Sequence, residues 1–369
     1  MPKVSVIVPC YNVAPYVARC LDSLTNQTLD DIEFICIDDK STDNTLEILQ
    51  KYAKQDKRIT VIASEKNSGV ATTRNKGLEI ASGEYIGFVD PDDYIDLDFY
   101  EKLYNRAVET DAIVIKASVI NTDMTTGETA LHWGVNVVKK HIAYFSSAFW
   151  SAIYRHDFLK KHNIKFPDGL LTAEDAVFLT HVGTTTQNIA FVDDTSYHYF
   201  YKRPGSLDSE FLTHKKAQSG LTAIKTNLKL IENANLGKSD FTKHMEFHVL
   251  GHIYHEINKK FENDDDRQKF FLLVVELYNK YEMLQSYIIN RFSRRTTKLI
   301  QKNDYKNYVR FICRGKKRYY LFGLIPFIKI ERYVESEYFS LFDFIPLMKI
   351  YKGRKYYLFN CLLIIKTKG

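Results

Sequence analysis

The stretch Val4–Asn12, VSVIVPCYN, decides the fold class. Its first five residues are mostly apolar and β-branched, which is typical of a strand buried on both faces of a parallel sheet. Polar residues follow at Pro9–Asn12, so the strand ends there in a loop. A helix predicted over about 14–25 provides the crossover that a parallel neighbour needs.

The same alternation continues to about residue 115. The apolar runs predict strands over 32–37, 59–63 and 85–89. Between them we expect one helix opened by the capping oxygens of Ser41-Thr42-Asp43 and another over about 70–81. This regular order predicts an α/β, Rossmann-like fold, a mostly parallel sheet flanked by helices. In such sheets ligands bind beyond the carboxyl ends of the strands.

Composition divides the rest of the chain into further parts. Residues 116–211 look mixed, include a short helix near His156–His162, and complete a first domain over 1–211. We divide this domain into one half over about 1–115 and another over about 116–211. A helical region is predicted over 212–290, and a basic, aromatic tail follows over 291–369.

The overall composition excludes several classes of protein. The chain has 369 residues, of which 45% are hydrophobic and 26% charged, and this suits a folded core and not general disorder. Its five cysteines show no paired metal-ligand spacing, which argues against a disulfide-built secreted domain. We see no secretory signal and no apolar run of the ~18 residues that span a bilayer. A cytoplasmic protein is therefore expected.

The tail differs sharply from the body in charge and pattern. Residues 291–369 hold 19 Lys and Arg against 5 Asp and Glu, a balance of +14, whereas the remainder has 32 against 40, a balance of −8. Three similar units follow one another: Tyr319–Ile330 (YYLFGLIPFIKI), Phe339–Ile350 (FSLFDFIPLMKI) and Tyr356–Thr367 (YYLFNCLLIIKT). Each unit is interpreted as a short hairpin or an amphipathic segment.

Three functions are open to this tail. Basic residues between aromatics can bind single-stranded nucleic acid, but the Ile-Pro and Leu-Phe content is too apolar for a solvated groove, so no nucleic-acid partner is expected. A small core that packs on the body of the chain or mediates oligomerisation is one alternative. Attachment to an anionic membrane surface is the other, and we favour it because apolar, aromatic and cationic residues are combined.

Four carboxylates follow two separate strands and should meet at one edge of the sheet: Asp38, Asp39, Asp90 and Asp92. Crowded carboxylates repel one another unless a cation neutralises them, and oxygen-rich surroundings suit Mg²⁺ or Mn²⁺ completed by phosphate oxygens. Arg74 and the helix N-terminus before it add positive potential for phosphate. Taken alone, Asp-Pro-Asp-Asp at 90–93 is also good turn chemistry.

The combination of motifs is more specific than any one of them. No GxxxxGK[ST] or GxGxxG follows the first strand, which removes the usual support for kinase-like and dinucleotide-binding functions. The relevant stretches are VSVIVPCYN (4–12), DDKSTDNT (38–45), NSGVATTRNKG (67–77), FVDPDD (88–93), TAEDAVF (172–178) and YHYFYKRPGS (197–206). In order and spacing they resemble the family 2 glycosyltransferases over roughly 3–210, and more narrowly the bacterial galactosyl- and N-acetylhexosaminyltransferases of capsule and lipooligosaccharide assembly.

The resemblance implies a GT-A fold, a UDP-sugar donor bound by the half over about 1–115, an acceptor bound by the half over about 116–211, a divalent metal (Mn²⁺ or Mg²⁺) and inversion at the anomeric carbon. It implies that Asp175 is the general base, with Glu174 as the competitor. It also implies that Asp92 is the principal metal ligand with Asp93 nearby as a second metal-site residue, and that His198 and Arg203 close over the diphosphate. Asp39, or alternatively Asp38, would accept the uracil imide hydrogen. The full set implied for the nucleotide sugar is Pro9, Tyr11, Asn12, Asp38, Asp39, Asn67, Gly69, Arg74, Asp90, Asp92, His198 and Arg203.

The predicted function is transfer of a hexose or N-acetylhexosamine, galactose first, from a UDP-sugar to a hydroxyl of a bacterial surface glycan or a lipid-linked glycan. This would take place at the cytoplasmic face of the inner membrane. The alternative is a non-catalytic subunit that binds a sugar nucleotide. One departure from the family pattern is Ala173, where many relatives carry Gly, and its methyl group is expected to trim the acceptor site.

One further cluster has two interpretations. His244, His248, His252 and His255 fall on one stripe of a predicted helix. Histidines at i and i+4 can share a metal ion, but no Asp or Cys is spaced to complete the set. A polar stripe packed against the catalytic domain or another subunit is therefore the favoured interpretation.

Overall fold

The computed structural model describes most, but not all, of the chain. The described residues are 1–133, 148–201, 211–234, 260–280, 285, 294–312, 317–321, 325–332, 336–341, 345–351 and 354–357. They form two compact units, Met1–Asn263 and Asp264–Gly369. The first unit continues past residue 211, because helix α8 (His214–Asn233) packs against helix α7 (Glu174–Thr185) within it.

The first unit is built on one sheet, whose strand order is β3-β2-β1-β4-β8-β6-β9-β5, with β7 beside β6. The strands are β1 (Val4–Cys10), β2 (Ile32–Asp38), β3 (Ile59–Ala63), β4 (Tyr85–Phe88), β5 (Tyr94–Ile95), β6 (Val114–Asp123), β7 (Thr129–Trp133), β8 (Ala152–Arg155) and β9 (Ile189–Tyr201). The first four are parallel, as predicted. The second half is mixed because β8 runs antiparallel to both β4 and β6, and this corrects the expectation of a mostly parallel sheet.

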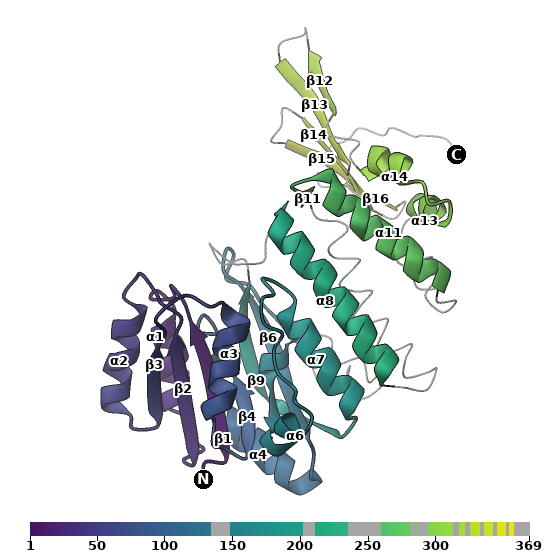
Figure 1. Cartoon of the computed structure of the whole chain (residues 1–369). Coiled ribbons are helices and arrows are strands. Elements are labelled where there is room, and N and C mark those ends of the chain that lie inside the picture. Colours follow the sequence, from purple (N-terminus) through teal and green to yellow (C-terminus); the bar gives the residue numbers. More distant parts are fainter. Residues whose placement is uncertain are drawn as a thin grey trace. The chain divides into compact units, whose positions relative to one another are not determined.

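Helices cover both faces of this sheet (Figure 1). One face is covered by α1 (Val17–Thr25), α2 (Thr45–Gln55) and α4 (Phe99–Thr110). The opposite face is covered by α3 (Val70–Ile80), α6 (His156–Lys161) and α7. Helix α6 confirms the short helix expected there. The unit is therefore a three-layer α/β structure.

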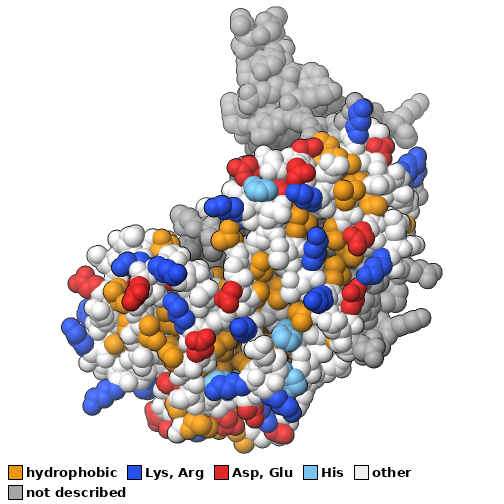
Figure 2. All heavy atoms as spheres, viewed as in Figure 1, with side chains coloured by type: hydrophobic (Ala, Val, Ile, Leu, Met, Phe, Trp, Pro, Cys, Tyr) orange, Lys and Arg blue, Asp and Glu red, His pale blue; other side chains and the backbone are white. Residues whose placement is uncertain are grey.

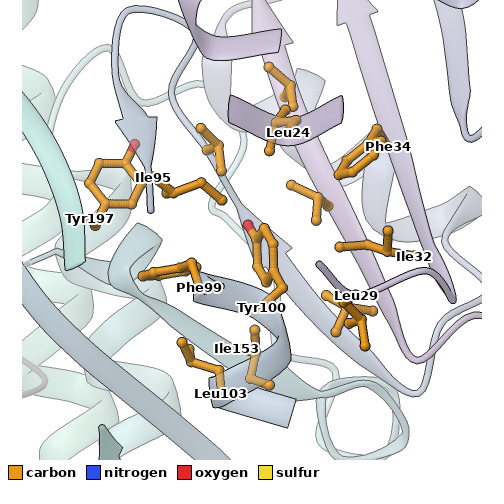
Figure 3. Packing of buried hydrophobic residues seen from close by; sticks show 14 of the residues in the cluster. Leu24, Leu29, Ile32, Phe34, Ile95, Phe99, Tyr100, Leu103, Ile153 and Tyr197 are labelled. Carbon is orange, nitrogen blue, oxygen red and sulfur yellow. The ribbon is translucent and has the colours of Figure 1, made fainter. Parts of the chain in front are cut away.

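The core explains why these elements hold together. On the α1 and α4 face, Leu24, Phe34, Phe99 and Tyr100 are each fully buried (Figure 3). Burying one such side chain contributes about 1.5–3 kcal/mol. On the other face α3 lies so close to β1 that a Cβ added to Gly77 would stand 2.5 Å from Ile7 Cγ2. Glycine there lets α3 hold its N-terminus at the edge of the sheet.

The second unit contains helices and a separate sheet. Its helices are α11 (Asp264–Lys280), α13 (Arg294–Gln301) and α14 (Tyr305–Ile312). Tyr305 and Tyr308 of α14 pack against Phe271, and the Tyr305 hydroxyl donates to Asp264 of α11. The histidine stripe at 244–255 lies outside the described residues.

The first two tail repeats form hairpins, which was one of the two interpretations of the sequence, and most of the third repeat lies outside the described residues. Five antiparallel strands follow in chain order: β12 (Lys317–Leu321), β13 (Ile325–Arg332), β14 (Ser336–Leu341), β15 (Ile345–Tyr351) and β16 (Arg354–Tyr357). The hairpins β12–β13 and β14–β15 share one irregularity, in which the register shifts just before a residue that faces Pro326 or Pro346. Proline cannot donate to a strand ladder, so a bulge at that point is expected.

Charge is mixed on the face shown in Figure 2. Acidic and basic side chains alternate over the described surface there, and neither sign forms one continuous field. Among the helices that the structure describes, none combines the length and the apolar character needed to cross a membrane.

Candidate active site

The loops after β1 and β2 are fastened to each other. The Asn12 backbone N–H donates to Ser41 Oγ at 3.0 Å, and the Thr42 N–H donates to Asn12 Oδ1 at 2.8 Å. Asn12 therefore joins the loop after β1 to the loop after β2. Pro9 is buried in β1, whereas Tyr11 is 47% exposed, so that its ring is accessible to a flat ligand such as a nucleobase.

The two aspartates after β2 differ in environment. Asp39 is buried and accepts from the backbone N–H groups of Ser68, at 2.9 and 3.0 Å, and of Gly69, at 2.8 Å. Asp38 Oδ2 accepts from the Ser41 N–H at 3.1 Å, while its Oδ1 is buried and has no hydrogen-bond partner among the described residues. Asp39 thus positions the start of α3, and Asp38 has the spare acceptor.

The turn before α3 needs glycine at one position. Gly69 has φ +84° and ψ 159°, a backbone region that residues with a Cβ rarely adopt. Nothing lies within 4 Å of a Cβ added there, so the requirement comes from the backbone and not from crowding. Asn67 lies just before it and is exposed.

Arg74 lies at the centre of the site, and its role differs from the predicted one. It is 4% exposed, its Nη2 donates to Asp90 Oδ1 at 2.9 Å, and its Nη1 donates to Glu174 Oε1 at 2.8 Å. The guanidinium also lies over the rings of Phe149, at 4.5 Å, and Phe166, at 5.2 Å. A cation held this way is not presented to a diphosphate. Arg74 instead joins the DPDD loop to the start of α7.

This arrangement separates the two candidate bases. Glu174 is held by Arg74, whereas Asp175 Oδ1 accepts from the backbone N–H of Ala176 at 2.7 Å. Burial raises the pKa of both carboxyl groups, and the charge of Arg74 opposes that shift in each. A carboxylate with a raised pKa is a better proton acceptor near neutral pH. The geometry favours Asp175 as the base and Glu174 as part of the scaffold.

The DPDD loop is held by two residues to which the sequence motifs assigned no role, Tyr197 and Arg19, although Tyr197 opens the quoted stretch 197–206. Tyr197 of β9 is fully buried, and its hydroxyl donates to Asp93 Oδ2 at 2.9 Å and accepts from the Asp90 N–H at 3.0 Å. Arg19 of α1 donates to the Asp92 carbonyl at 2.7 Å. The place of Tyr197 in that stretch was a usable signal, whereas Arg19 acts on a backbone carbonyl and leaves no spacing signal in the sequence.

Asp93 does not suit the metal-binding role predicted for it. It is 1% exposed, and its Oδ1 accepts from the Phe200 N–H at 2.9 Å while its Oδ2 accepts from Tyr197. Burial raises the pKa of Asp93 well above its usual value. Its carboxyl group anchors the loop to β9, and the metal-binding role then falls to the partly exposed Asp92.

The prediction that His198 closes over a diphosphate is also at odds with its surroundings. Its Nε2 lies 2.8 Å from Asp96 Oδ1, and its ring stacks on Tyr94 with centroids 4.2 Å apart. His198 therefore belongs to the β5–β9 pairing. Arg203 lies outside the described residues.

The residues fit a metal that the protein holds with few ligands. Within the described part of the chain, no cluster of three His, Cys, Asp or Glu side chains is placed to form a cation cage. Asp92 lies beside Asp90, whose Oδ1 is already bound by Arg74. One carboxylate is a suitable donor set for Mg²⁺ or Mn²⁺ when phosphate oxygens complete the shell. The site would then depend on its substrate for metal binding.

Comparison with known proteins agrees with this site. The model of the family described as Glycosyl transferase family 2 matches residues 5–170. The chain is 32% identical over 266 residues to EpsH of Bacillus subtilis (strain 168), covering 68% of this chain and 75% of that relative. It is 36% identical over 217 residues to the poly(ribitol-phosphate) beta-N-acetylglucosaminyltransferase TarS of Staphylococcus aureus (strain MW2), covering 56% of this chain but only 36% of that one.

A solved structure supports the fold. The crystal structure of S. aureus TarS residues 1–349 in complex with UDP-GlcNAc superposes with a TM-score of 0.65 at 23% identity, covering 83% of this chain and 89% of that one. The mixed sheet and its flanking helices have the GT-A fold of that structure. The chain belongs to glycosyltransferase family 2 and is a glycosyltransferase. It is therefore an enzyme, and the alternative of a non-catalytic subunit is set aside.

Proposed function

We propose that the chain transfers a hexose or N-acetylhexosamine from a UDP-sugar to a hydroxyl group of a bacterial surface glycan, with inversion at the anomeric carbon. The observation that carries this proposal is that two neighbouring carboxylates, Glu174 and Asp175, have different hydrogen-bond partners. Arg74 holds Glu174, so that Asp175 is left to face the reaction from the first turn of α7.

The proposed reaction needs only one proton acceptor from the protein. The Asp175 carboxylate takes the proton of the acceptor hydroxyl while that oxygen forms a bond to the anomeric carbon. The bond from that carbon to the diphosphate breaks on the opposite face, and UDP leaves with the electron pair. Arg74 keeps Asp90 and Glu174 fixed on either side of this path. A divalent ion held by Asp92 would offset the charge that develops on the diphosphate.

Support for the donor and acceptor comes from chemistry and from relatives. Tyr11 and the spare oxygen of Asp38 provide an aromatic face and an acceptor, which is what a uracil ring requires. TarS binds UDP-GlcNAc in its crystal structure, and this supports a UDP-sugar here. Its name as a poly(ribitol-phosphate) transferase supports a surface polymer or its lipid-linked precursor as acceptor. Galactose and N-acetylglucosamine are the first donors to compare.

The test is a UDP-release assay over a panel of UDP-sugars, with Mn²⁺, with Mg²⁺ and with chelator. We expect one donor to be turned over, and Asp175→Asn to lower that rate by about 10²–10⁴ because the proton acceptor is lost. Asp157→Asn is the matched control, since Asp157 is an exposed aspartate in the first turn of α6. If Asp175→Asn kept full activity and Glu174→Gln lost it, Glu174 would be the base and Asp175 would be part of the scaffold.

We propose further that the tail attaches the enzyme to an anionic membrane surface. The +14 balance of residues 291–369 and the hairpin repeats support this. The full-length protein should sediment with vesicles that contain phosphatidylglycerol, and ~1 M salt should release it because the Debye length falls to about 3 Å. Equal binding to neutral vesicles would contradict an electrostatic attachment. Self-association without vesicle binding would favour oligomerisation instead.

A further inference from the structure

The segment that leads to Asp175 is tied to α3 at its start. Asn75 donates to the Phe166 carbonyl at 2.8 Å and accepts from the Phe166 N–H at 3.0 Å. Thr72 donates to Asp168 Oδ1 at 3.2 Å. Since α3 also carries Arg74, the beginning of this segment is fixed relative to the DPDD loop.

The end of the same segment is tied to α8, which lies beside α7 (Figure 1). Ser219 Oγ accepts from the backbone N–H groups of Leu171, at 2.9 Å, and Thr172, at 3.2 Å. The same hydroxyl lies 3.2 Å from the Thr172 carbonyl, to which it donates. Ser219 is 7% exposed, so these bonds are largely shielded from water. One buried hydroxyl therefore serves three backbone groups just before the proposed base.

The residue between this clamp and the base is strained. Ala173 has φ +64° and ψ 20°, a left-handed conformation that costs a residue with a Cβ about 1–2 kcal/mol. Strain of this kind persists only where the surroundings enforce it. The hydrogen bonds of Ser219 to Leu171 and Thr172 supply such a constraint, because they fix the two peptides that precede Ala173.

We propose that Ser219 is a positioning residue for catalysis: it holds the backbone before α7 so that Asp175 faces the acceptor hydroxyl. This inference rests on the proposed function, because it takes Asp175 as the base. Ser219 lies beyond the residues that the family model matches, 5–170. Helix α8 thus contributes to the active site without touching a substrate.

The first test measures the clamp itself and needs no substrate. Amide hydrogen exchange at Leu171 and Thr172 should be about tenfold faster or more in Ser219→Ala, because both N–H groups lose their acceptor. Ser219→Thr, which keeps a hydroxyl, should recover most of the protection. Thr222→Ala is the matched control, since the Thr222 hydroxyl is exposed and bonds only within its own helix, to the Gln218 carbonyl. Unchanged exchange in Ser219→Ala would overturn the proposal.

The second test asks whether the clamp positions the base. Ser219→Ala should lower kcat by about tenfold or more, since small displacements of a catalytic group are costly, while the Kd for UDP stays within about twofold of the wild type. The pKa of the Asp175 carboxyl, measured by a carbon-13 NMR titration, should move towards that of an ordinary aspartate, because the displaced carboxyl gains contact with water. Faster exchange without any change in kcat or in this pKa would overturn the proposal.

The two hypotheses can fail separately. If the wild type turns over no UDP-sugar, the proposed function fails, and the exchange rates and the measured pKa of Asp175 still decide whether Ser219 positions that carboxyl. If the wild type is active but Ser219→Ala unfolds, the clamp is tested with Ser219→Thr and with the amide exchange rates of the wild type. Protection of Leu171 and Thr172 no greater than that of exposed loop amides would then contradict the clamp.

Discussion

The donor side and the acceptor side of the active site are built in different ways. On the donor side, short loops bind each other through residues that lie inside recognisable motifs, as Asn12 does with Thr42 and Asp39 with Gly69. On the acceptor side, the base follows a segment that is held by Asn75 from one helix and by Ser219 from another. The first kind of geometry joins residues of the quoted motifs that lie 30 positions apart, and the second depends in addition on Ser219, which lies outside every motif.

The difference shows where sequence motifs stop being informative. A motif records side chains that touch each other or a ligand at fixed spacing. It does not record a hydroxyl such as that of Ser219, which acts through backbone groups 48 positions away. Arg74 connects the two sides, because it binds Asp90 of one and Glu174 of the other. Removing that connection is the most direct way to test whether the two sides are independent.

Arg74→Met should have the largest effect on stability. It leaves Asp90 and Glu174 partly buried without their cation, and breaking a buried ion pair costs about 3–5 kcal/mol. Urea unfolding measures this loss. Arg106→Met is the control, since Arg106 forms only an exposed pair with Glu109 that contributes about 0–1 kcal/mol. A loss below about 1 kcal/mol in Arg74→Met would mean that the two sides are held together by other contacts.

Gly69→Ala tests the donor side alone. The φ of +84° with ψ of 159° is nearly closed to alanine, so the change should cost about 1–3 kcal/mol. UDP affinity should fall as well, because the Gly69 N–H that binds Asp39 would move. Ser68→Ala is a suitable control, since the Ser68 hydroxyl makes only an exposed bond to the Lys66 carbonyl. If Gly69→Ala left UDP binding intact and slowed turnover, the division into two sides would be wrong.

Much of the fold could be predicted from the sequence. The parallel half of the sheet, from β1 to β4, appears where β-branched runs such as 4–8 and 59–63 predicted it, because buried parallel strands have a distinct composition. The antiparallel strand β8 was not predicted. Its direction depends on where the chain returns to the sheet after residue 133, and the residues Ala152–Arg155 alone do not carry that information.

The candidate site, like the fold, was predicted from the sequence only in part. The motifs placed Asp90, Arg74 and Glu174 in one predicted site, but they assigned Arg74 to a phosphate and gave no ion pair between these residues, which the structure shows. The burial of this guanidinium between two carboxylates follows from the folded structure and not from the motifs. Likewise nothing in the letters DPDD distinguishes Asp92, which is partly exposed, from Asp93, which Tyr197 and Phe200 bind. Burial decides these roles, and burial is a property of the assembled fold.

Asp93 gives a prediction for pH. Its pKa is raised on folding, so the stability that it contributes is present in full below the pKa of an unfolded aspartate, about 3.9, and is lost as the pH rises through the folded value. The free energy of unfolding of the wild type minus that of Asp93→Asn should therefore fall with rising pH, by about 1.4 kcal/mol for each pH unit in that window. Taking the difference removes the effects of other carboxylates. A difference that is flat from pH 4 to 8 would show that Asp93 is ionised at little cost.

Ala173→Gly should have the smallest effect, and it tests the acceptor side alone. Glycine removes the strain of the left-handed conformation, but it also gives the unfolded chain more freedom, so a net gain of up to about 1 kcal/mol is expected in urea unfolding. The same change removes the methyl group that we predict to trim the acceptor site, so the KM for the acceptor should change while the Kd for UDP does not. Asn303→Gly, at another left-handed residue with φ +49° in the second unit, is the control for the backbone effect alone. If Ala173→Gly altered UDP binding as strongly as acceptor binding, the strained residue before the base would serve both substrates. The contrast between a donor side held by its own motifs and an acceptor side held from outside them would then have to be abandoned.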